Sequence, residues 1–205
     1  MSIRTRVFAA VYDPLMRPSE KGALGRLRDD VIGRARGSVL EIGAGTGMNL
    51  ARYHDVERVV AAEPEEPMRR RLLRKVGGAR VPVEVVDAPA ETLPFADGEF
   101  DTVVSTLVLC SVDDPAASLR EVRRVLAPGG RFVFLEHGGG DGKRAEWQRR
   151  LDGIWAAVNA GCHLTRNVAD LLPAAGLQPE EIRVVEPRPV PPIILPFRIG
   201  TAVAA

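Results

Sequence analysis

Short apolar runs of strand length alternate with amphipathic helical segments along most of this 205-residue chain. This alternation predicts crossover units, in which each helix returns the chain so that the next strand lies parallel to the last. We therefore expect an α/β fold whose mostly parallel sheet carries helices on both faces. The predicted strands are 39–42, 58–63, 81–86, 100–109 and 130–136, and the predicted helices are 19–36, 48–54, 66–76, 115–127, 142–161 and 165–176.

The last thirty residues have a different pattern. Five prolines lie between positions 187 and 196, and proline is tolerated in sheets mainly at edges because it has no backbone N–H to donate. We therefore predict two edge strands separated by a proline-rich connection. The whole chain, 1–205, is expected to form one domain: a helical cap (1–36), a cofactor-binding core (37–137), and substrate-side helices with the terminal strands (138–205).

Composition excludes several classes of protein. Lysine and arginine (28) nearly balance aspartate and glutamate (27), so no bulk positive charge is available to neutralise phosphates, and a nucleic-acid partner is not expected. Cys110 and Cys162 are too few for a disulfide framework and lack the CxxC spacing typical of zinc or redox sites. No apolar run is long enough to span a membrane. These features predict a soluble, cytoplasmic protein without a bound metal.

The stretch SVLEIGAGTGMNL, residues 38–50, indicates a buried strand that enters a glycine-rich turn. Its G-x-G-x-G spacing differs from the G-x-G-x-x-G of dinucleotide-binding turns, and no lysine followed by serine or threonine closes a phosphate-binding P-loop. What remains is a turn whose bare backbone lets a ligand lie directly against it.

Two acids suggest the nature of that ligand. Glu41 precedes the turn, where a carboxylate disfavours phosphate and favours a cationic amine. Glu63 ends the next predicted strand, the position at which nucleotide-binding folds of this kind hold ribose hydroxyls. An amine combined with a ribose indicates S-adenosylmethionine.

Several motifs together resemble the class I S-adenosylmethionine-dependent methyltransferases: E-x-G-x-G-x-G at 41–47, the acids Glu63 and Asp87, LPFADGEFD at 93–101, and LREVRRVLAPGG at 119–130. The resemblance implies a Rossmann-like, seven-stranded sheet with a reversed last strand, and the cofactor lying across the carboxyl ends of the first strands. The cofactor-binding residues that it implies are Glu41, Gly43, Ala44, Gly45, Gly47, Glu63, Pro64, Asp87, Ala88, Ala90, Glu91, Thr106 and Leu107.

A narrower resemblance covers most of the chain. TLVLCSV (106–112), EH (136–137), GCHLTR (161–166) and the closing PFRIGTAV are similar to the methyltransferase-like thiol S-methyltransferases, whose animal members are microsomal. The hydrophobic N-terminal membrane segment of those animal proteins has no counterpart here, so we do not carry membrane attachment over. VDAPAE (86–91) is one residue longer than the family pattern, which leaves either the Asp87 carboxylate or the backbone near Ala90 to meet the adenine edge.

The candidate catalytic residues lie at the ends of two predicted strands. His137 ends the fifth predicted strand and could take a proton from a substrate thiol. Cys110 ends the fourth and is either a nucleophile or, as we favour, a small apolar wall of the pocket, since methyl transfer needs no covalent enzyme intermediate. Trp147 and Trp155 are candidates for the substrate-side wall. Thr165 is predicted to cap a helix, and Arg166 is an alternative ligand for an anionic substrate group.

Three functional hypotheses follow. The first is S-methylation of a small thiol, in detoxification or natural-product tailoring. The second keeps methyl transfer but moves the acceptor to a lipid amine, a quinone or another small metabolite. The third is a cofactor-binding partner protein without catalysis. Nothing in the sequence determines the oligomeric state.

Overall fold

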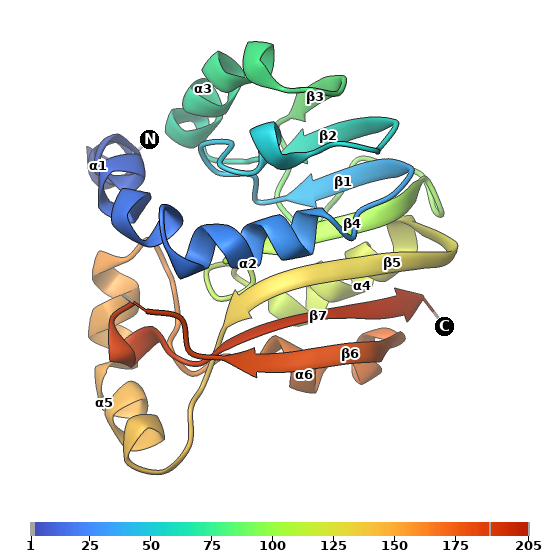
Figure 1. Ribbon diagram of the computed structural model, residues 1–205. Coiled ribbons are helices and arrows are strands. Elements are labelled where there is room, and N and C mark those ends of the chain that lie inside the picture. Colours follow the sequence, from blue (N-terminus) through green and yellow to red (C-terminus); the bar gives the residue numbers. More distant parts are fainter. Residues whose placement is uncertain (1–2, 189, 205) are drawn as a thin grey trace.

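The computed structural model describes residues 3–188 and 190–204, which include a seven-stranded sheet in the order β3-β2-β1-β4-β5-β7-β6 (Figure 1). Neighbouring strands from β3 to β5 are parallel, whereas β7 runs antiparallel to both β5 and β6. The predicted α/β sheet with a reversed last strand is confirmed. The strands are β1 (Ser38–Ile42), β2 (Arg58–Ala62), β3 (Val83–Val86), β4 (Phe100–Thr106), β5 (Leu126–His137), β6 (Leu177–Val185) and β7 (Phe197–Ala204).

Helices cover both faces of the sheet because side chains along each strand alternate between two apolar layers. Val39 and Val59 face α2 (Ala23–Ile32), which buries Val31 and Ile32 against them. Farther along the same face, α3 (Glu66–Lys75) packs Leu72 near β2. In Figure 1, α2 lies in front of the sheet.

The opposite face carries the larger apolar cluster. Leu40, Val103 and Phe132 point to this side, where α4 (Pro115–Val125) buries Leu119 and Val122. The α4 helix begins at an N-cap, Asp114, whose side chain accepts hydrogen bonds from the amides of Ala116 and Ala117. The short α6 helix (Val168–Leu171) and the 3-10 turn η3 (Pro173–Ala175) complete this layer.

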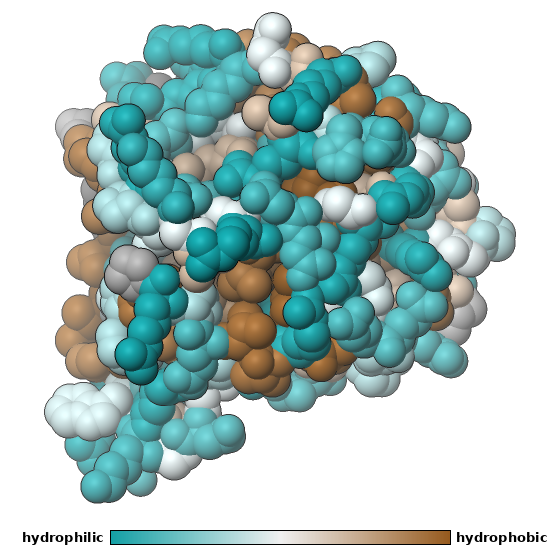
Figure 2. Space-filling view, viewed as in Figure 1, coloured by the Kyte–Doolittle hydropathy of each residue, from teal (hydrophilic) through white to brown (hydrophobic). Residues whose placement is uncertain are grey.

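The predicted N-terminal helical cap is made of two helices, α1 (Ile3–Glu20) and α2. Figure 1 shows α1, with α5 (Gly142–Val158), at the end of the sheet where β1 and β5 terminate. Both helices expose apolar side chains, and Figure 2 shows such side chains at its left margin, over this region. They are Val7, Val11 and Leu15 on α1, and Trp147, Ile154 and Val158 on α5.

The helix predicted over 48–54 is not formed. Only a 3-10 turn, η1 (Leu50–Arg52), follows the glycine-rich loop. Helix α2 already covers β1 on this face, and the Tyr53 side chain inserts into the same apolar layer. A helix continued to residue 54 would have to occupy the apolar layer that α2 and Tyr53 fill, and the chain instead turns into β2.

Other boundaries also differ from the predictions: the helix predicted over 19–36 is divided between α1 and α2, β3 begins at residue 83, and β5 spans residues 126–137. Strand β4 ends at Thr106 rather than at residue 109, because Leu107 adopts a left-handed backbone (φ +62°) and the chain turns away. The helix predicted over 165–176 is split into α6 and η3 at Pro173, which lacks the amide needed to continue an α-helix. Helix α6 begins at Val168 with Asn167 in the N-cap position, so Thr165 caps no helix.

Strand β7 was predicted to be an edge strand, and this is wrong. Of the last two strands, β6 lies at an edge of the sheet, whereas β7 is hydrogen-bonded on both sides and largely buried. Its small residues are the reason that it fits between neighbours: a Cβ at Gly200 would lie 2.3 Å from the Glu181 carbonyl oxygen and 2.9 Å from the Phe134 ring.

Gln148 joins α5 to the proline-rich connection. Its side chain is fully buried, its Nε2 donates to the carbonyls of Ile193 (2.9 Å) and Leu195 (3.0 Å), and its Oε1 accepts from the Gly140 amide (2.7 Å). One side-chain amide thus satisfies three backbone groups. The 3-10 turn η4 (Pro192–Ile194) is held against α5 in this way.

We predict that Gln148→Glu lowers the free energy of unfolding by about 2–4 kcal/mol, because a buried carboxylate oxygen would face two carbonyl oxygens. Urea denaturation at neutral pH measures the change. Arg149→Gln, at an exposed neighbour on the same helix, is the matched control and should change stability by less than about 0.5 kcal/mol. Equal stability of Gln148→Glu and the wild type would show that this amide does not anchor the connection.

Candidate active site

The glycine-rich turn leaves β1 with three left-handed residues, Gly43 (φ +57°), Gly45 (φ +58°) and Gly47 (φ +78°). A Cβ at Gly43 would lie 2.4 Å from Val108 Cγ1, and a Cβ at Gly47 would lie 2.8 Å from Leu72 Cδ1. Gly45 differs, since its Cβ would meet nothing closer than 3.9 Å. Packing therefore requires the outer two glycines, whereas the middle one presents bare backbone to open space.

Glu63 lies directly beside this turn. Its Oε2 accepts from the Gly45 amide at 2.8 Å and its Oε1 accepts from the Glu65 amide at 2.8 Å. Burial raises the pKa of the Glu63 carboxyl, and the two amide hydrogen bonds oppose that rise. The second predicted acid thus adjoins the glycine backbone, as a ribose-binding group would. Pro64 follows it at the turn into α3, where its carbonyl accepts from Arg69.

Glu41 lies beneath the turn, and both of its carboxyl oxygens contact the protein. Its Oε1 accepts from Asn49 Nδ2 (2.8 Å) and its Oε2 from the Tyr53 hydroxyl (2.9 Å). The residue is only 1 % exposed, and burial raises the pKa of its carboxyl to about 7. Both oxygens already have partners within the protein, so the observed contacts of Glu41 stabilise the loop from below.

A buried arginine extends this network. Arg28, on α2, is 3 % exposed and donates to Thr106 Oγ1 (2.7 Å), to Asn49 Oδ1 (3.2 Å) and to Glu20 (2.7 Å). Thr106 also accepts from Asn49 Nδ2 (2.9 Å). The end of β4 and the loop after β1 are thereby held to the helical cap. Thr106 was predicted from the sequence as a site residue. Arg28 and Asn49 were not predicted, since neither lies in a recognised motif.

The cap reaches over the turn through α1. Asp13 accepts from Thr46 Oγ1 (2.5 Å) and from Lys75 Nζ (2.8 Å), which joins α1 to the glycine-rich turn and to the end of α3. Burial raises the pKa of Tyr12, which lies one residue earlier. Arg28 and Cys110 are both close enough to influence that pKa. Neither contact was predicted, because an i-to-i+33 pairing has no local sequence signal.

The remaining predicted cofactor residues surround the same edge of the sheet. Ala44 (6 % exposed), Ala88 (2 %) and Ala90 (5 %) are buried near it. Asp87 is exposed and forms an ion pair with Arg69 (2.6 Å). Glu91 accepts from the amides of Asp113 (2.8 Å) and Asp114 (3.3 Å), so its carboxylate supports the start of α4.

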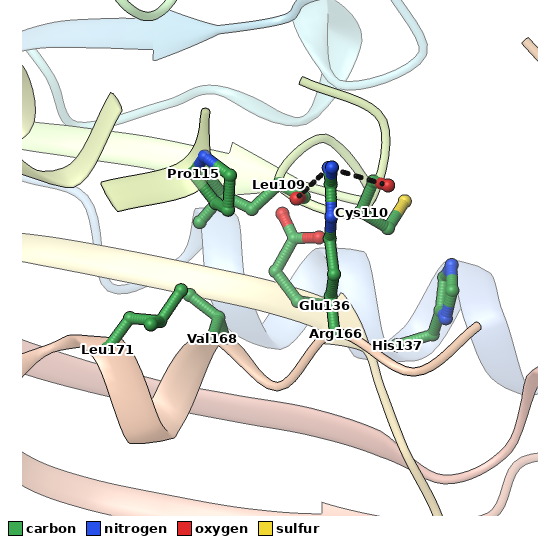
Figure 3. A pocket seen from close by; sticks show the side chains of 8 residues that line it. All are labelled: Leu109, Cys110, Pro115, Glu136, His137, Arg166, Val168 and Leu171. Carbon is green, nitrogen blue, oxygen red and sulfur yellow. Dashed lines mark hydrogen bonds between the residues drawn. The ribbon is translucent and has the colours of Figure 1, made fainter. Parts of the chain in front are cut away.

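The turn after β4 is tightly held. The Leu107 amide donates to the Leu135 carbonyl (2.8 Å), and the Val108 amide donates to the buried Glu136 carboxylate (3.0 and 3.1 Å). Arg166 Nη1 donates to the carbonyls of Leu109 (3.4 Å), Cys110 (3.1 Å) and Val112 (2.5 Å) (Figure 3). Arg166, considered as a ligand for an anionic substrate, therefore serves the backbone of this turn.

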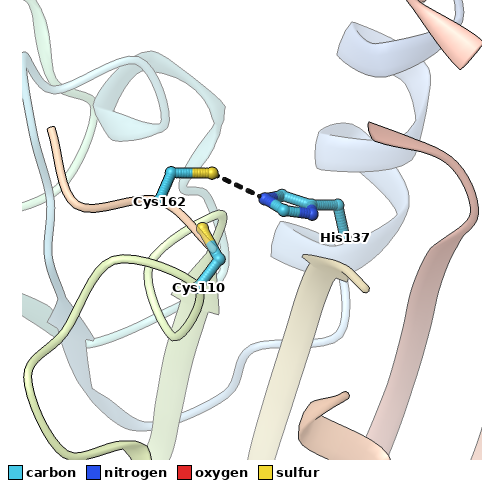
Figure 4. A group of neighbouring side chains, drawn as sticks. All are labelled: Cys110, His137 and Cys162. Carbon is cyan, nitrogen blue, oxygen red and sulfur yellow. Dashed lines mark hydrogen bonds between the residues drawn. The ribbon is translucent and has the colours of Figure 1, made fainter. Parts of the chain in front are cut away.

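Three chemically reactive side chains meet beyond the turn (Figure 4). His137 Nε2 lies 3.0 Å from Cys162 Sγ, and the ligand atoms of Cys110, His137 and Cys162 all lie within 4.8 Å of one another. Cys110 and His137, predicted separately from the ends of β4 and β5, are thus brought together. Cys162 joins them from the loop before α6.

The two thiols differ in acidity. The pKa of Cys162 is lowered below its ordinary value, most strongly by a hydrogen bond from Cys110 and next by one from His137. The Trp155 indole beside it lowers that pKa further. The pKa of Cys110 rises because it donates to Cys162 and is buried. Trp155 is therefore close to the reactive group, whereas Trp147 is 57 % exposed beneath Arg150.

A small pocket adjoins this group (Figure 3). Its cavity of about 10 Å³ has room for little more than one water molecule, and both Cys110 and His137 line it. The rest of the lining is Leu109, Pro115, Glu136, Arg166, Val168 and Leu171. The pocket thus combines one sulfur, an imidazole, a carboxyl group and a guanidinium with four apolar side chains.

The described residues fit S-adenosylmethionine on structural grounds. Gly45 leaves room above its backbone that any side chain would fill, and the Glu63 carboxylate lies against the same amide. Val108 packs on Gly43 and precedes Cys110 by two residues, so the glycine-rich turn and the reactive group occupy neighbouring positions. Fold and site together define a Rossmann-like protein of the methyltransferase class.

Comparisons with known proteins agree. The family described as a methyltransferase domain matches residues 40–134. Thiol S-methyltransferase TMT1A from Homo sapiens is 36% identical over 164 residues, covering 78% of this chain and 67% of the human protein. TMT1B from Rattus norvegicus is 39% identical over 134 residues, covering 63% of this chain and 55% of the rat protein. The chain thus spans about half to two thirds of these relatives' length.

Solved structures show the same fold. A SAM-dependent methyltransferase from Thermotoga maritima superposes with a TM-score of 0.72 over 100% of both chains at 21% sequence identity. This chain belongs to the S-adenosylmethionine-dependent methyltransferase family.

We predict different outcomes for two alanine substitutions in the turn. Gly45→Ala should weaken S-adenosylhomocysteine binding at least about tenfold with a stability loss near 1–2 kcal/mol from its left-handed backbone. Gly47→Ala should cost more stability, because its Cβ would collide with Leu72. Titration calorimetry and urea denaturation measure the two effects. Unchanged affinity in Gly45→Ala would place the cofactor elsewhere.

The raised pKa of Glu41 predicts a pH-dependent stability. Between about pH 4.5 and 7 the folded protein keeps a proton on Glu41 that the unfolded chain has released, so stability falls as pH rises through this window. The full effect is at most about 3 kcal/mol. Arg28 opposes the rise in pKa and Glu63 contributes to it.

Glu41→Gln should remove this contribution. Urea denaturation measures the free energy of unfolding at pH 5 and at pH 8. The amount by which the value at pH 5 exceeds the value at pH 8 should be smaller in the variant than in the wild type. Tyr53→Phe, which removes one hydrogen bond to Glu41, should instead steepen the dependence. Identical pH profiles for the wild type and Glu41→Gln would show that Glu41 is not protonated at neutral pH.

Proposed function

We propose that this protein transfers the methyl group of S-adenosylmethionine to the sulfur of a small thiol. The observation that carries the proposal is the meeting of Cys110, His137 and Cys162 next to the glycine-rich turn. Polarisable sulfur and imidazole groups suit a sulfur acceptor better than an amine or a carboxylate. The names of the relatives, thiol S-methyltransferases TMT1A and TMT1B, support the same acceptor.

The cofactor would lie along the carboxyl edge of β1, β2 and β4. Gly45 offers its backbone, Glu63 accepts hydrogen bonds from ribose hydroxyls, and Asp87 or the backbone near Ala90 meets the adenine edge. Ala44, Gly43 and Gly47 shape the turn, and Pro64, Ala88, Glu91, Thr106 and Leu107 would lie against the bound cofactor. Glu41 acts from beneath, through Asn49 and Tyr53.

The bound cofactor supplies a methyl group on a positively charged sulfonium. Because a thiolate acceptor is negative, both charges disappear as the methyl is transferred, and a dry pocket costs the charged reactants more than the transition state. The apolar walls Leu109, Val168 and Leu171 exclude water from the acceptor side. The helical cap, tied to the turn by Asp13, shields the other side.

The cellular setting is also part of the proposal. Both cysteines are free thiols, which suits a reducing compartment such as the cytoplasm. Among the described residues, no helix is both long and apolar enough to cross a membrane. Because acidic and basic residues nearly balance, the protein has no bulk positive charge with which to bind a nucleic acid, and we propose no such partner.

A panel of acceptors tests the proposal. The full-length protein is incubated with labelled S-adenosylmethionine and alkyl thiols, aryl thiols, quinols, amines or ethanolamine lipids, and S-adenosylhomocysteine release is followed. We expect turnover with thiols at least about 100-fold above that with the matching alcohols. Turnover only with oxygen or nitrogen acceptors would contradict the thiol assignment, and cofactor binding without any turnover would indicate a partner protein.

A further inference from the structure

The Cys110, His137 and Cys162 side chains form a set of two sulfur donors and one nitrogen donor, the composition of a metal-binding site. Two sulfurs and one imidazole nitrogen point toward one shared space (Figure 4), and the three donor atoms lie within 4.8 Å of one another. Cys110 is 4 % and His137 6 % exposed, so the group is largely shielded from water. A buried cluster of this composition needs an explanation.

The backbone around the cluster is fixed before any ligand binds. The His163 amide donates to the Cys110 carbonyl (2.8 Å), so the loop that carries Cys162 is hydrogen-bonded to the turn that carries Cys110. His163 Nδ1 in turn contacts Asp152 of α5 (2.7 Å), and Asp152 also accepts from the Leu164 amide (2.6 Å). Arg166 clamps the carbonyls on the other side of the turn. Both thiols are therefore held in place by their main chains.

The separations suit a tetrahedral metal. Zinc bonds of about 2.3 Å to sulfur and 2.0 Å to nitrogen place two sulfurs about 3.8 Å apart and a sulfur and a nitrogen about 3.5 Å apart. The observed contact of 3.0 Å between His137 Nε2 and Cys162 Sγ would have to open by only about half an ångström. With Nε2 on the metal, the ring proton of a neutral His137 would lie on Nδ1, which has no hydrogen-bond partner among the described residues.

We propose that Cys110, His137 and Cys162 bind one zinc ion through two thiolates and an imidazole, and that a fourth position stays open for the acceptor sulfur. Soft thiolate donors together with imidazole select zinc over magnesium or calcium. Three protein ligands with one open position are the arrangement of catalytic rather than structural zinc sites. Both Cys110 and His137 also line the small pocket beside the cluster.

The role of the open position rests on the proposed thiol methylation. The acceptor thiol loses its proton to water as its sulfur binds zinc. A lone pair of that sulfur then forms the new bond to the methyl carbon, while the bond from methyl to sulfonium breaks and its electron pair stays on the cofactor sulfur. The products are a thioether, S-adenosylhomocysteine and one proton, and no oxidant or reductant is consumed. In this scheme zinc, and not His137 acting as a base, keeps the acceptor ionised.

Cobalt(II) is the spectroscopic probe of the site. Reduced, metal-free protein is titrated with Co²⁺, and we expect a thiolate-to-cobalt charge-transfer band together with strong tetrahedral d–d bands that saturate at one equivalent and disappear when Zn²⁺ is added. Cys110→Ser and Cys162→Ser should each weaken cobalt binding more than about 100-fold, beyond the usual cost of losing an outer-shell partner. His54→Gln, at an exposed histidine away from the cluster, should bind cobalt as the wild type does.

Two further measurements keep the test decisive. Calorimetric binding of S-adenosylhomocysteine by both serine variants shows that they are folded, because their cofactor loop is unaltered. Protein purified without chelator should contain about one zinc per chain. Absence of the charge-transfer band in the wild type, its persistence in both serine variants, or a Cys110–Cys162 disulfide in place of metal under reducing conditions would each overturn the site.

The metal site and the proposed function fail in different ways. Addition of an alkyl thiol to the cobalt form should shift the charge-transfer band, whereas the matching alcohol should not. Undiminished thiol methylation by zinc-free protein overturns the catalytic role of the metal while the proposed function stands. Stoichiometric metal binding combined with turnover of amines or quinols alone overturns the thiol assignment while the metal site stands.

Discussion

A buried guanidinium beneath the sheet edge is the contact on which the site depends. Arg28 is almost fully shielded from water, and an unpaired buried charge would be costly, so its partners must be present. They come from α1, from the loop after β1 and from the end of β4, namely Glu20, Asn49 and Thr106. Because Asn49 also donates to Glu41, the helical cap, the glycine-rich turn and two strand ends are positioned together.

The acceptor side depends on a second constraint, the sharp turn after β4. Leu107 leaves the strand in a left-handed conformation, and Glu136, Arg166 and His163 bind the backbone that follows. Carboxyl ends of neighbouring parallel strands meet at one edge of a sheet, which is where open α/β folds bind their ligands. The turn brings Cys110 to that edge beside His137, and the glycine-rich turn lies next to it through Val108.

Much of the fold and part of the site could be predicted because they depend on short-range patterns. The continuous buried runs of β1 and β2 and the helical periodicity of α4 are properties of a few consecutive residues. The glycine-rich turn and Glu63 belong to motifs whose spacing is set by local geometry. The helix expected at 48–54 does not form, because α2, which is distant in sequence, covers that face of the sheet. Strand β7 was misplaced because sheet order depends on which strands pair, and not on their own residues.

The amino-acid sequence by itself determined the class of fold, the glycine-rich turn, and the acids and strand-end residues that resemble those of methyltransferases. Only the tertiary structure decided what those residues contact. It directed both oxygens of Glu41 to Asn49 and Tyr53 and placed Asp13 over the turn. It also gathered Cys110, His137 and Cys162, which are separated by at least 25 residues, into one donor set. The physical reason is that contacts between distant segments are set by packing and by the need to pair buried polar groups, which no local spacing records.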